Sequence, residues 1–255
     1  MSTGSRGPEP EPAECLLPTD VSADGAALRL PDLCPVSFRF VPRVKGDAGP
    51  TCGRMRAMPS LVPPVLPPGT LAKTAQPALP ADGGLTLRPW HPADAPAVVA
   101  AFRDPAIQQW HRRRADSEDE AREWIAGWRA TWEAETDAHW AVVDTATDAL
   151  VGRAALRCLA LSEGQADAGY WTLPAARGRG VAAHAVTAMT AWAFEDVGFH
   201  RLELQHSVAN PASCRVAAKT GFALEGIRRS ALRHPDAWHD MHLHARLAPR
   251  PEPGA

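Results

Sequence analysis

The chain has 255 residues, of which 45% are hydrophobic and 22% are charged, and its net charge is -2 at neutral pH. This composition is typical of a globular protein with one sizeable core and excludes a fibrous or a wholly disordered chain. Nucleic-acid and membrane-surface binding both need clustered positive charge, so the balanced charges predict neither partner. Residues 1–18 lack the features of a signal peptide and no apolar run is long enough to span a membrane, so the expected location is the cytoplasm.

Residues 1–83 differ in composition from the rest of the chain. They contain 15 of the 25 prolines and only two aromatic residues, Phe38 and Phe40. Such a segment buries too little apolar surface to offset the entropy of ordering it, so we expect a disordered tail, with a polyproline II linker over residues 61–68. Met55 and Met58 also offer alternative translation starts. The folded domain is expected over residues 84–248, followed by a disordered end, 249–255.

The first half of the expected domain begins with a short strand over residues 85–88. A helix over 93–102 follows, and Asp104-Pro105 ends it. Ser117, with Glu120 three residues later, forms the capping signature of a second helix that extends to about residue 135. On this helix Trp124, Trp128 and Trp132 recur every four residues, so they form one stripe that is expected to pack against a sheet.

The second half of the domain begins with three strands separated by turn-forming residues, which predicts an antiparallel meander. The expected strands are 139–144, 151–161 and 166–173. A long helix over 180–197, a strand over 201–207, a helix over 210–220 and strands over 223–229 and 238–246 complete the domain. The fold class is therefore α/β (α+β), with a mixed, mostly antiparallel sheet flanked by helices.

The most informative local feature is a glycine loop at the start of the long helix, with the sequence Arg177-Gly178-Arg179-Gly180-Val181-Ala182. A helix amino terminus offers unpaired N–H groups, and glycine lets a phosphate approach closely. A P-loop is disfavoured because no Gly-Lys-Ser/Thr follows, and a dinucleotide fold because the G-x-G-x-x-G spacing is absent. Coenzyme A is the third candidate.

Three motifs together resemble a known family. The loop matches the R/Q-x-x-G-x-G/A signature of the GNAT superfamily of N-acetyltransferases. Downstream, the pattern Asn210-Pro-Ala-Ser213, followed by Gly221-Phe-Ala-Leu-Glu225-Gly226, is similar to that of the RimJ/RimL-like branch, which acetylates ribosomal proteins. The resemblance covers residues 85–247 and implies the GNAT fold and an acetyl-coenzyme A-dependent transferase.

The resemblance also implies how acetyl-coenzyme A binds. Backbone amides of residues 177–182 hold the pyrophosphate, and the pantetheine arm pairs like an extra strand with the strand that contains Trp171 and ends at Leu173. Asn210 and Ser213 complete the coenzyme site. For Asn210 a simple helix N-cap is an equal alternative.

Direct attack of the amine on the thioester requires one group that takes up a proton and one that donates a proton. At the position where many relatives carry a tyrosine as the acid, this chain has Ala217. The resemblance therefore suggests Ser213 as the acid, with helix capping as its structural alternative. It also suggests Asp167 as the base, with a solvated strand carboxylate as the alternative.

The acceptor is the least determined part of this interpretation. A protein amino-terminal amine is the first expectation, and an amino acid, a polyamine or an aminoglycoside is the alternative, as is a non-catalytic acyl-coenzyme A-binding module. His239, His242 and His244 lie on one expected strand without a cysteine or carboxylate at a recognised metal-ligand spacing, so no metal site is expected.

Overall fold

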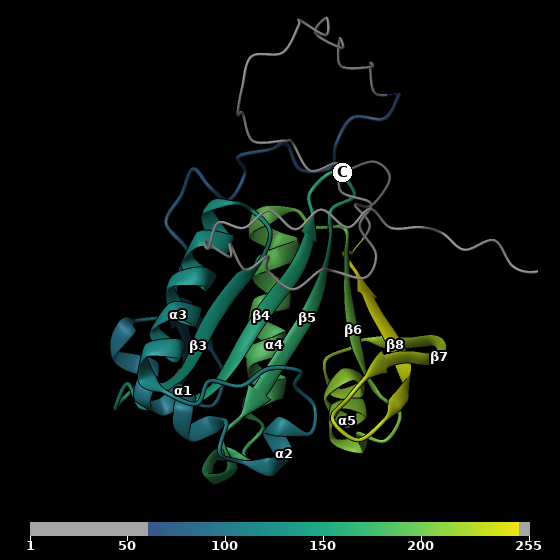
Figure 1. Cartoon of the computed structure of the whole chain (residues 1–255). Coiled ribbons are helices and arrows are strands. Elements are labelled where there is room, and N and C mark those ends of the chain that lie inside the picture. The colour runs from purple at the N-terminus through teal and green to yellow at the C-terminus, as the bar shows by residue number, and fades with distance from the viewer. Residues whose placement is uncertain (1–60, 250–255) are drawn as a thin grey trace, which may run out of the picture. The chain divides into compact units, whose positions relative to one another are not determined.

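A computed structural model describes residues 61–249, which contain an eight-stranded sheet in the order β1-β2-β3-β4-β5-β6-β8-β7 (Figure 1). Every neighbouring pair is antiparallel except β5 and β6, which are parallel. The strands are β1 (Leu79–Ala81), β2 (Leu85–Pro89), β3 (Ala138–Asp144), β4 (Leu150–Ala160), β5 (Gln165–Thr172), β6 (Arg201–Ser207), β7 (Ala223–Arg233) and β8 (Trp238–Leu247). The predicted meander is thus confirmed as β3-β4-β5.

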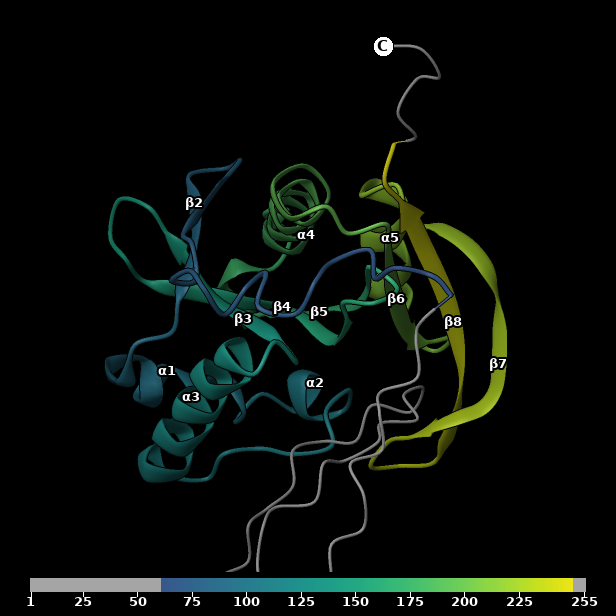
Figure 2. The same ribbon diagram turned by 90° about the horizontal axis from the view of Figure 1, so that it is seen from above.

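Helices cover both faces of the sheet, as Figure 2 shows from above. One face carries α1 (Ala95–Ala101), α2 (Pro105–Gln108) and α3 (Glu118–Glu133), and the other carries α4 (Val181–Ala191) and α5 (Pro211–Lys219). This arrangement confirms the predicted fold class. None of the helices within residues 61–249 is both long and apolar enough to cross a membrane.

The helix boundaries follow local signals in the sequence. The Ser117 hydroxyl accepts a hydrogen bond from the Glu120 amide at the start of α3, as predicted. Gly198, in the left-handed region at φ 92°, ends the long helix after a π-helical stretch, Trp192–Val197. Beyond Asp104-Pro105, where the sequence predicts only the end of a helix, the chain forms the short helix α2, because the Asp104 carboxylate caps it by accepting from the Ala106 amide.

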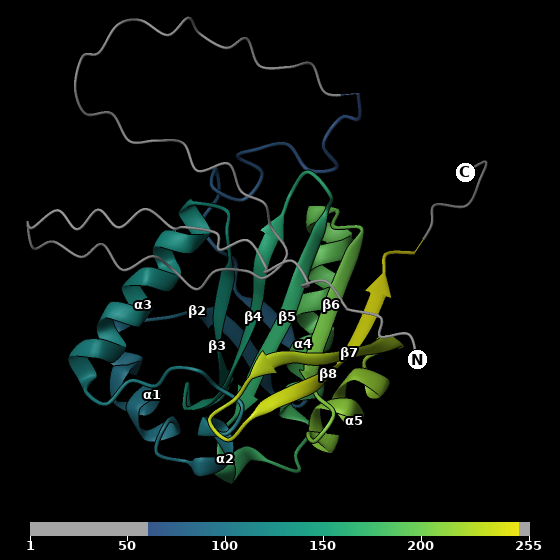
Figure 3. The same ribbon diagram turned by 45° about the vertical axis from the view of Figure 1, so that its right-hand side comes forward.

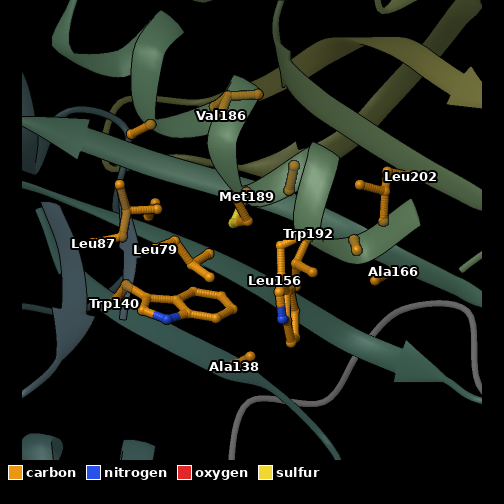
Figure 4. Close-up of a cluster of buried hydrophobic side chains, with 14 of the residues drawn as sticks. Leu79, Leu87, Ala138, Trp140, Leu156, Ala166, Val186, Met189, Trp192 and Leu202 are labelled. Atoms are coloured by element: carbon orange, nitrogen blue, oxygen red, sulfur yellow. The ribbon is translucent and has the colours of Figure 1, made fainter. Parts of the chain in front are cut away.

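The main core lies between the sheet and α4. Trp140, Leu156, Met189 and Leu202 are fully buried there and meet side chains from β1 and β2 (Figure 4). A second cluster fills the space between the sheet and α1 and α3, and it contains Trp171 together with Trp90 and Phe102. The predicted tryptophan stripe is divided between these two clusters: Trp132 packs in the first, and Trp124 and Trp128 pack against the second.

The expectation that residues 61–83 are disordered is wrong. Leu66 and Leu71 are buried in the main core, and β1 pairs with β2. The Glu135 carboxylate accepts hydrogen bonds from the amides of Gly69 and Leu71, both at 2.6 Å. A few buried leucines and hydrogen bonds from distant elements therefore order a segment whose composition alone predicts disorder. Residues 1–60 and 250–255, for which disorder was also expected, lie outside the described residues.

The packing of this segment can be tested by shortening one leucine. Leu71→Ala should lower the free energy of unfolding by about 2–4 kcal/mol, because it removes a buried side chain and leaves a cavity. Leu61→Ala is the matched control, since Leu61 is 100% exposed and its loss should cost less than about 0.5 kcal/mol. Urea unfolding of both variants measures the difference. Equal stabilities would show that the segment does not contribute to the core.

Candidate active site

The site begins where β5 and β6 separate. The two strands pair in parallel from Gln165↔Arg201 to Ala168↔Leu204, and no pairing continues beyond that point (Figure 1). The second half of β5 therefore has a free edge toward β6. Unpaired backbone groups of this kind pair with an extended amide-bearing ligand.

The direction of the backbone groups identifies which residues face this free edge. The Leu173 amide donates to the Val151 carbonyl, so it faces β4, and Trp171, two residues earlier, faces the same way. Tyr170 and Thr172 therefore present their N–H and C=O groups to the opening. Trp171 and Leu173 were expected to contact the coenzyme. Their backbone groups face β4, so the residues whose backbone groups border the opening are their neighbours along β5. The Trp171 side chain is buried in the second core.

The glycine loop lies at the amino terminus of α4, as predicted. Gly178 and Gly180 both adopt positive φ, 78° and 79°, and Gly180 is the residue that caps the helix. A Cβ on Gly180 would lie 2.9 Å from the His184 ring, whereas a Cβ on Gly178 would meet nothing within 4 Å. The loop is thus held open by glycine. The first amides of α4, which include those of Val181 and Ala182, have no acceptor inside the helix and suit a phosphate.

The two loop arginines differ in their surroundings. Arg177 forms an ion pair with Asp104, the capping residue of α2, so it connects the loop to the helical face on the other side of the sheet. Arg179 is exposed. Asp104 therefore neutralises the charge of Arg177 and not that of Arg179.

Helix α5 carries the expected acid. Asn210 caps the helix, since its side-chain oxygen accepts from the Ser213 amide at 3.2 Å, which bears out its predicted role as an N-cap. Ser213 is half-buried in the first turn, and Ala217, in the place of the usual tyrosine, is fully buried.

Tyr170 is a residue that the sequence analysis did not consider as an acid. Its hydroxyl is buried and has no hydrogen-bond partner among the described residues. Burial raises its pKa to about 12, and the nearby Ser213 hydroxyl opposes this rise without reaching hydrogen-bond geometry. It is the only tyrosine of the chain, and that count was the one signal in the sequence that could have drawn attention to it.

Asp167 lies on β5 one residue before the strands separate, between Arg157 of β4 and Glu203 of β6. Its pKa is raised to about 6, chiefly because burial disfavours the charged form; Arg157 opposes this rise and Glu203 adds to it. A carboxyl group with a pKa near the working pH is well suited to take up a proton.

The face of the sheet on which Asp167 lies carries further polar and aromatic groups. Arg153 of β4 contacts His139 at 2.7 Å and lies over the Trp128 ring of α3. Burial lowers the pKa of His139 well below its usual value, so that its ring is neutral. Trp110, just after α2, packs edge-on against His234 of the β7–β8 turn and against His239 of β8, so the segment after α2 contacts this end of β8.

Three comparisons with known proteins agree with this geometry. A family model described as "Acetyltransferase (GNAT) domain" matches residues 84–223, more than half of the chain. The chain is 25% identical over 167 residues to an uncharacterized N-acetyltransferase of Bacillus subtilis, YoaA, and this match covers 65% of the chain and 94% of that protein. It is 33% identical over 82 residues to the ribosomal-protein-serine acetyltransferase of Escherichia coli, which covers 32% of the chain and 46% of that protein.

Solved structures show the same fold at lower identity. RimL, a ribosomal L7/L12 alpha-N-protein acetyltransferase in complex with coenzyme A, superimposes with a TM-score of 0.63 at 21% identity, covering 68% of this chain and 98% of that chain. RimJ of Mycobacterium smegmatis superimposes with a TM-score of 0.60 at 24% identity, covering 68% and 86%. With the glycine loop, the separated strands and the family match in agreement, the chain belongs to the GNAT family of acetyl-coenzyme A-dependent N-acetyltransferases.

Proposed function

We propose that the protein transfers the acetyl group to the amino-terminal amine of a protein or peptide. The observation that carries this proposal is the position of Asp167, a carboxyl group with a pKa of about 6 at the point where β5 and β6 part. Acetyl-coenzyme A supplies the thioester that the amine attacks. Asp167 takes up the amine proton, directly or through a water molecule, while amides of residues 177–182 hold the pyrophosphate.

The choice of a protein amine rests on the branch motif and on the relatives. Asn210 and Ser213 lie at the start of α5 in the pattern of the RimJ/RimL-like enzymes, and several structural neighbours are named for ribosomal-protein substrates. A small-molecule acceptor is the second candidate, since a microcin self-immunity acetyltransferase solved with acetyl-coenzyme A and AMP also superimposes, with a TM-score of 0.60 at 16% identity.

A thiol-release assay tests the acceptor. The purified chain and acetyl-coenzyme A are mixed with peptides that begin with free serine, alanine or methionine, and with amino acids, spermidine and an aminoglycoside. We expect turnover with at least one free peptide and none with the same peptide blocked at its amino terminus, and mass spectrometry locates the acetyl group. Turnover with small amines alone would favour the second candidate. Binding of acetyl-coenzyme A without any turnover would favour a non-catalytic module.

Two hydroxyl groups can protonate the departing thiolate, and paired substitutions distinguish them. Ser213→Ala should lower kcat by about 10²-fold with little change in acetyl-coenzyme A affinity, because a positioned acid typically contributes about 10²–10⁴ in rate. Tyr170→Phe is the matched variant; it removes a buried hydroxyl that has no hydrogen-bond partner within residues 61–249, and it should lower kcat less. A larger loss in Tyr170→Phe would assign the acid to the strand. A loss of affinity with normal kcat in Ser213→Ala would make Ser213 a binding residue.

A further inference from the structure

Four side chains from three elements converge beneath α5. His206 of β6, Cys214 of α5, and His242 and His244 of β8 each offer a nitrogen or sulfur atom, and these atoms all lie within 4.8 Å of one another. His242 pairs across the sheet with His206, and His244 pairs with Leu204, so all three rings lie on the same face of the sheet, the face that Cys214 of α5 approaches. Figure 3 shows α5 beside β6 and β8. The strand that carries His242 and His244 has no cysteine at a recognised ligand spacing, and the fold brings Cys214 to these residues from α5.

The hydrogen bonds of two of these rings leave their inner nitrogens without a proton. His206 Nδ1 lies 2.8 Å from the Ser207 carbonyl, and His244 Nδ1 lies 3.2 Å from the Phe222 carbonyl. A carbonyl oxygen only accepts, so each Nδ1 carries a proton that it donates. In a neutral imidazole the other nitrogen, Nε2, is then a bare acceptor.

The two bare nitrogens face each other. His206 Nε2 and His244 Nε2 lie 3.2 Å apart. When both rings are neutral and protonated at Nδ1, two lone pairs therefore approach closely with no proton between them. His242 Nδ1 is also buried and has no hydrogen-bond partner among the described residues. Buried polar atoms of this kind are costly unless another group satisfies them. A cation between the rings would satisfy all three nitrogens at once.

We propose that His206, Cys214, His242 and His244 form a tetrahedral zinc site that fastens α5 to β6 and β8. Three imidazoles and one thiolate are the donors that Zn²⁺ prefers, and with bonds of about 2.0–2.3 Å the ligand atoms of a tetrahedron lie about 3.3–3.6 Å apart. The His206 and His244 nitrogens lie 3.2 Å apart, just below the lower end of this range. The backbone carbonyls that accept from Nδ1 of His206 and His244 would hold both rings in the orientation that metal binding needs.

The site has a structural role in this proposal. Four protein ligands leave no open position for a substrate, which is typical of structural zinc. Binding displaces the Cys214 proton to solvent, so the thiolate completes the shell. Cys214 follows Ser213 directly on α5, so the metal would fix the helix that carries Asn210 and Ser213.

Cobalt(II) provides a direct test, because a thiolate bound to tetrahedral Co²⁺ gives a charge-transfer band in the near ultraviolet. The full chain is freed of metal with a chelator, checked for folding by circular dichroism and titrated with Co²⁺ and then with Zn²⁺, in the absence of acetyl-coenzyme A. We expect one equivalent of Co²⁺ to bind with this band and Zn²⁺ to displace it. Failure to bind Co²⁺ stoichiometrically would overturn the proposal without bearing on acetyl transfer.

Variants connect the signal to these residues. Cys214→Ser should abolish the charge-transfer band. His242→Asn should weaken Co²⁺ binding by more than about 100-fold, since the loss of a group that only hydrogen-bonds to a metal ligand already costs about 10–100-fold. His200→Gln is the matched control, because His200 is exposed outside the cluster, and it should bind as the unaltered chain does. A band that persists in Cys214→Ser, or an unchanged affinity in folded His242→Asn, would place the metal elsewhere.

Discussion

Gly180→Asp is expected to weaken acetyl-coenzyme A binding by more than about 100-fold. Gly180 caps α4 at φ 79°, and an added Cβ would lie 2.9 Å from the His184 ring. A side chain there fills the space that lets a phosphate approach the helix. A carboxylate also repels the negatively charged pyrophosphate and competes with it for the positive end of the helix dipole. Isothermal titration calorimetry with acetyl-coenzyme A measures the loss, and a thermal unfolding curve confirms that the variant is folded.

The effect of charge can be separated from that of shape. Gly180→Asn is the matched control, because asparagine has the same size as aspartate and both tolerate the left-handed region better than other side chains. The asparagine variant should bind acetyl-coenzyme A about tenfold more tightly than the aspartate variant, a difference in binding free energy of about 1.4 kcal/mol. Unchanged affinity in folded Gly180→Asp would remove the pyrophosphate from this loop. Equal losses in the two variants would assign the effect to crowding alone.

The sequence predicted the elements whose ends have local chemical signals. Ser117 and Asn210 cap their helices as expected, and Gly198 ends the long helix. These signals depend on hydrogen bonds between residues only a few positions apart, so the residue types that form them can be recognised in the sequence. The family motifs added functional roles for the glycine loop and for α5, because each motif is a short run of residues at the start of a helix that was already predicted.

The errors occurred where distant elements decide the outcome. The segment around Leu71 is ordered by Glu135, 64 residues further along the chain, and composition cannot register such a partner. Similarly, the register of β5 with β4 determines which residues of β5 direct their N–H and C=O groups toward the opening, and the Leu173–Val151 hydrogen bond fixes that register. The histidine cluster has the same origin, since its four ligands come from three elements.

Asp167→Asn is expected to lower kcat/KM at pH 8 by about 10²–10⁴-fold, because it removes the proposed proton acceptor while keeping its shape. In the unaltered protein kcat/KM should fall as the pH drops below about 6, where Asp167 takes up a proton. A steady-state pH profile measures both effects. Activity of Asp167→Asn equal to that of the unaltered chain would show that another group is the base.

Stability should change in the opposite direction to activity. The folded pKa of Asp167, about 6, lies above its ordinary value of 3.8, so the native state binds the proton more tightly and loses stability as the pH rises through this window. Above pH 6 the charged carboxyl costs at most about 3 kcal/mol, since each pKa unit corresponds to about 1.4 kcal/mol. Asp167→Asn removes this cost, so it should unfold at a higher urea concentration than the unaltered chain at pH 8.

Glu203→Gln is the matched control for both measurements. Glu203 lies opposite Asp167 on β6 and forms an ion pair with Arg201. The negative charge of Glu203 adds to the rise in the pKa of Asp167. Glu203→Gln should therefore lower the pH at which kcat/KM falls on the acidic side, and kcat/KM at pH 8 should not change. If Glu203→Gln instead loses activity at pH 8 and Asp167→Asn keeps it, the base lies on β6. A carboxyl that lowers stability where it raises activity is the combination expected of a buried base kept for catalysis.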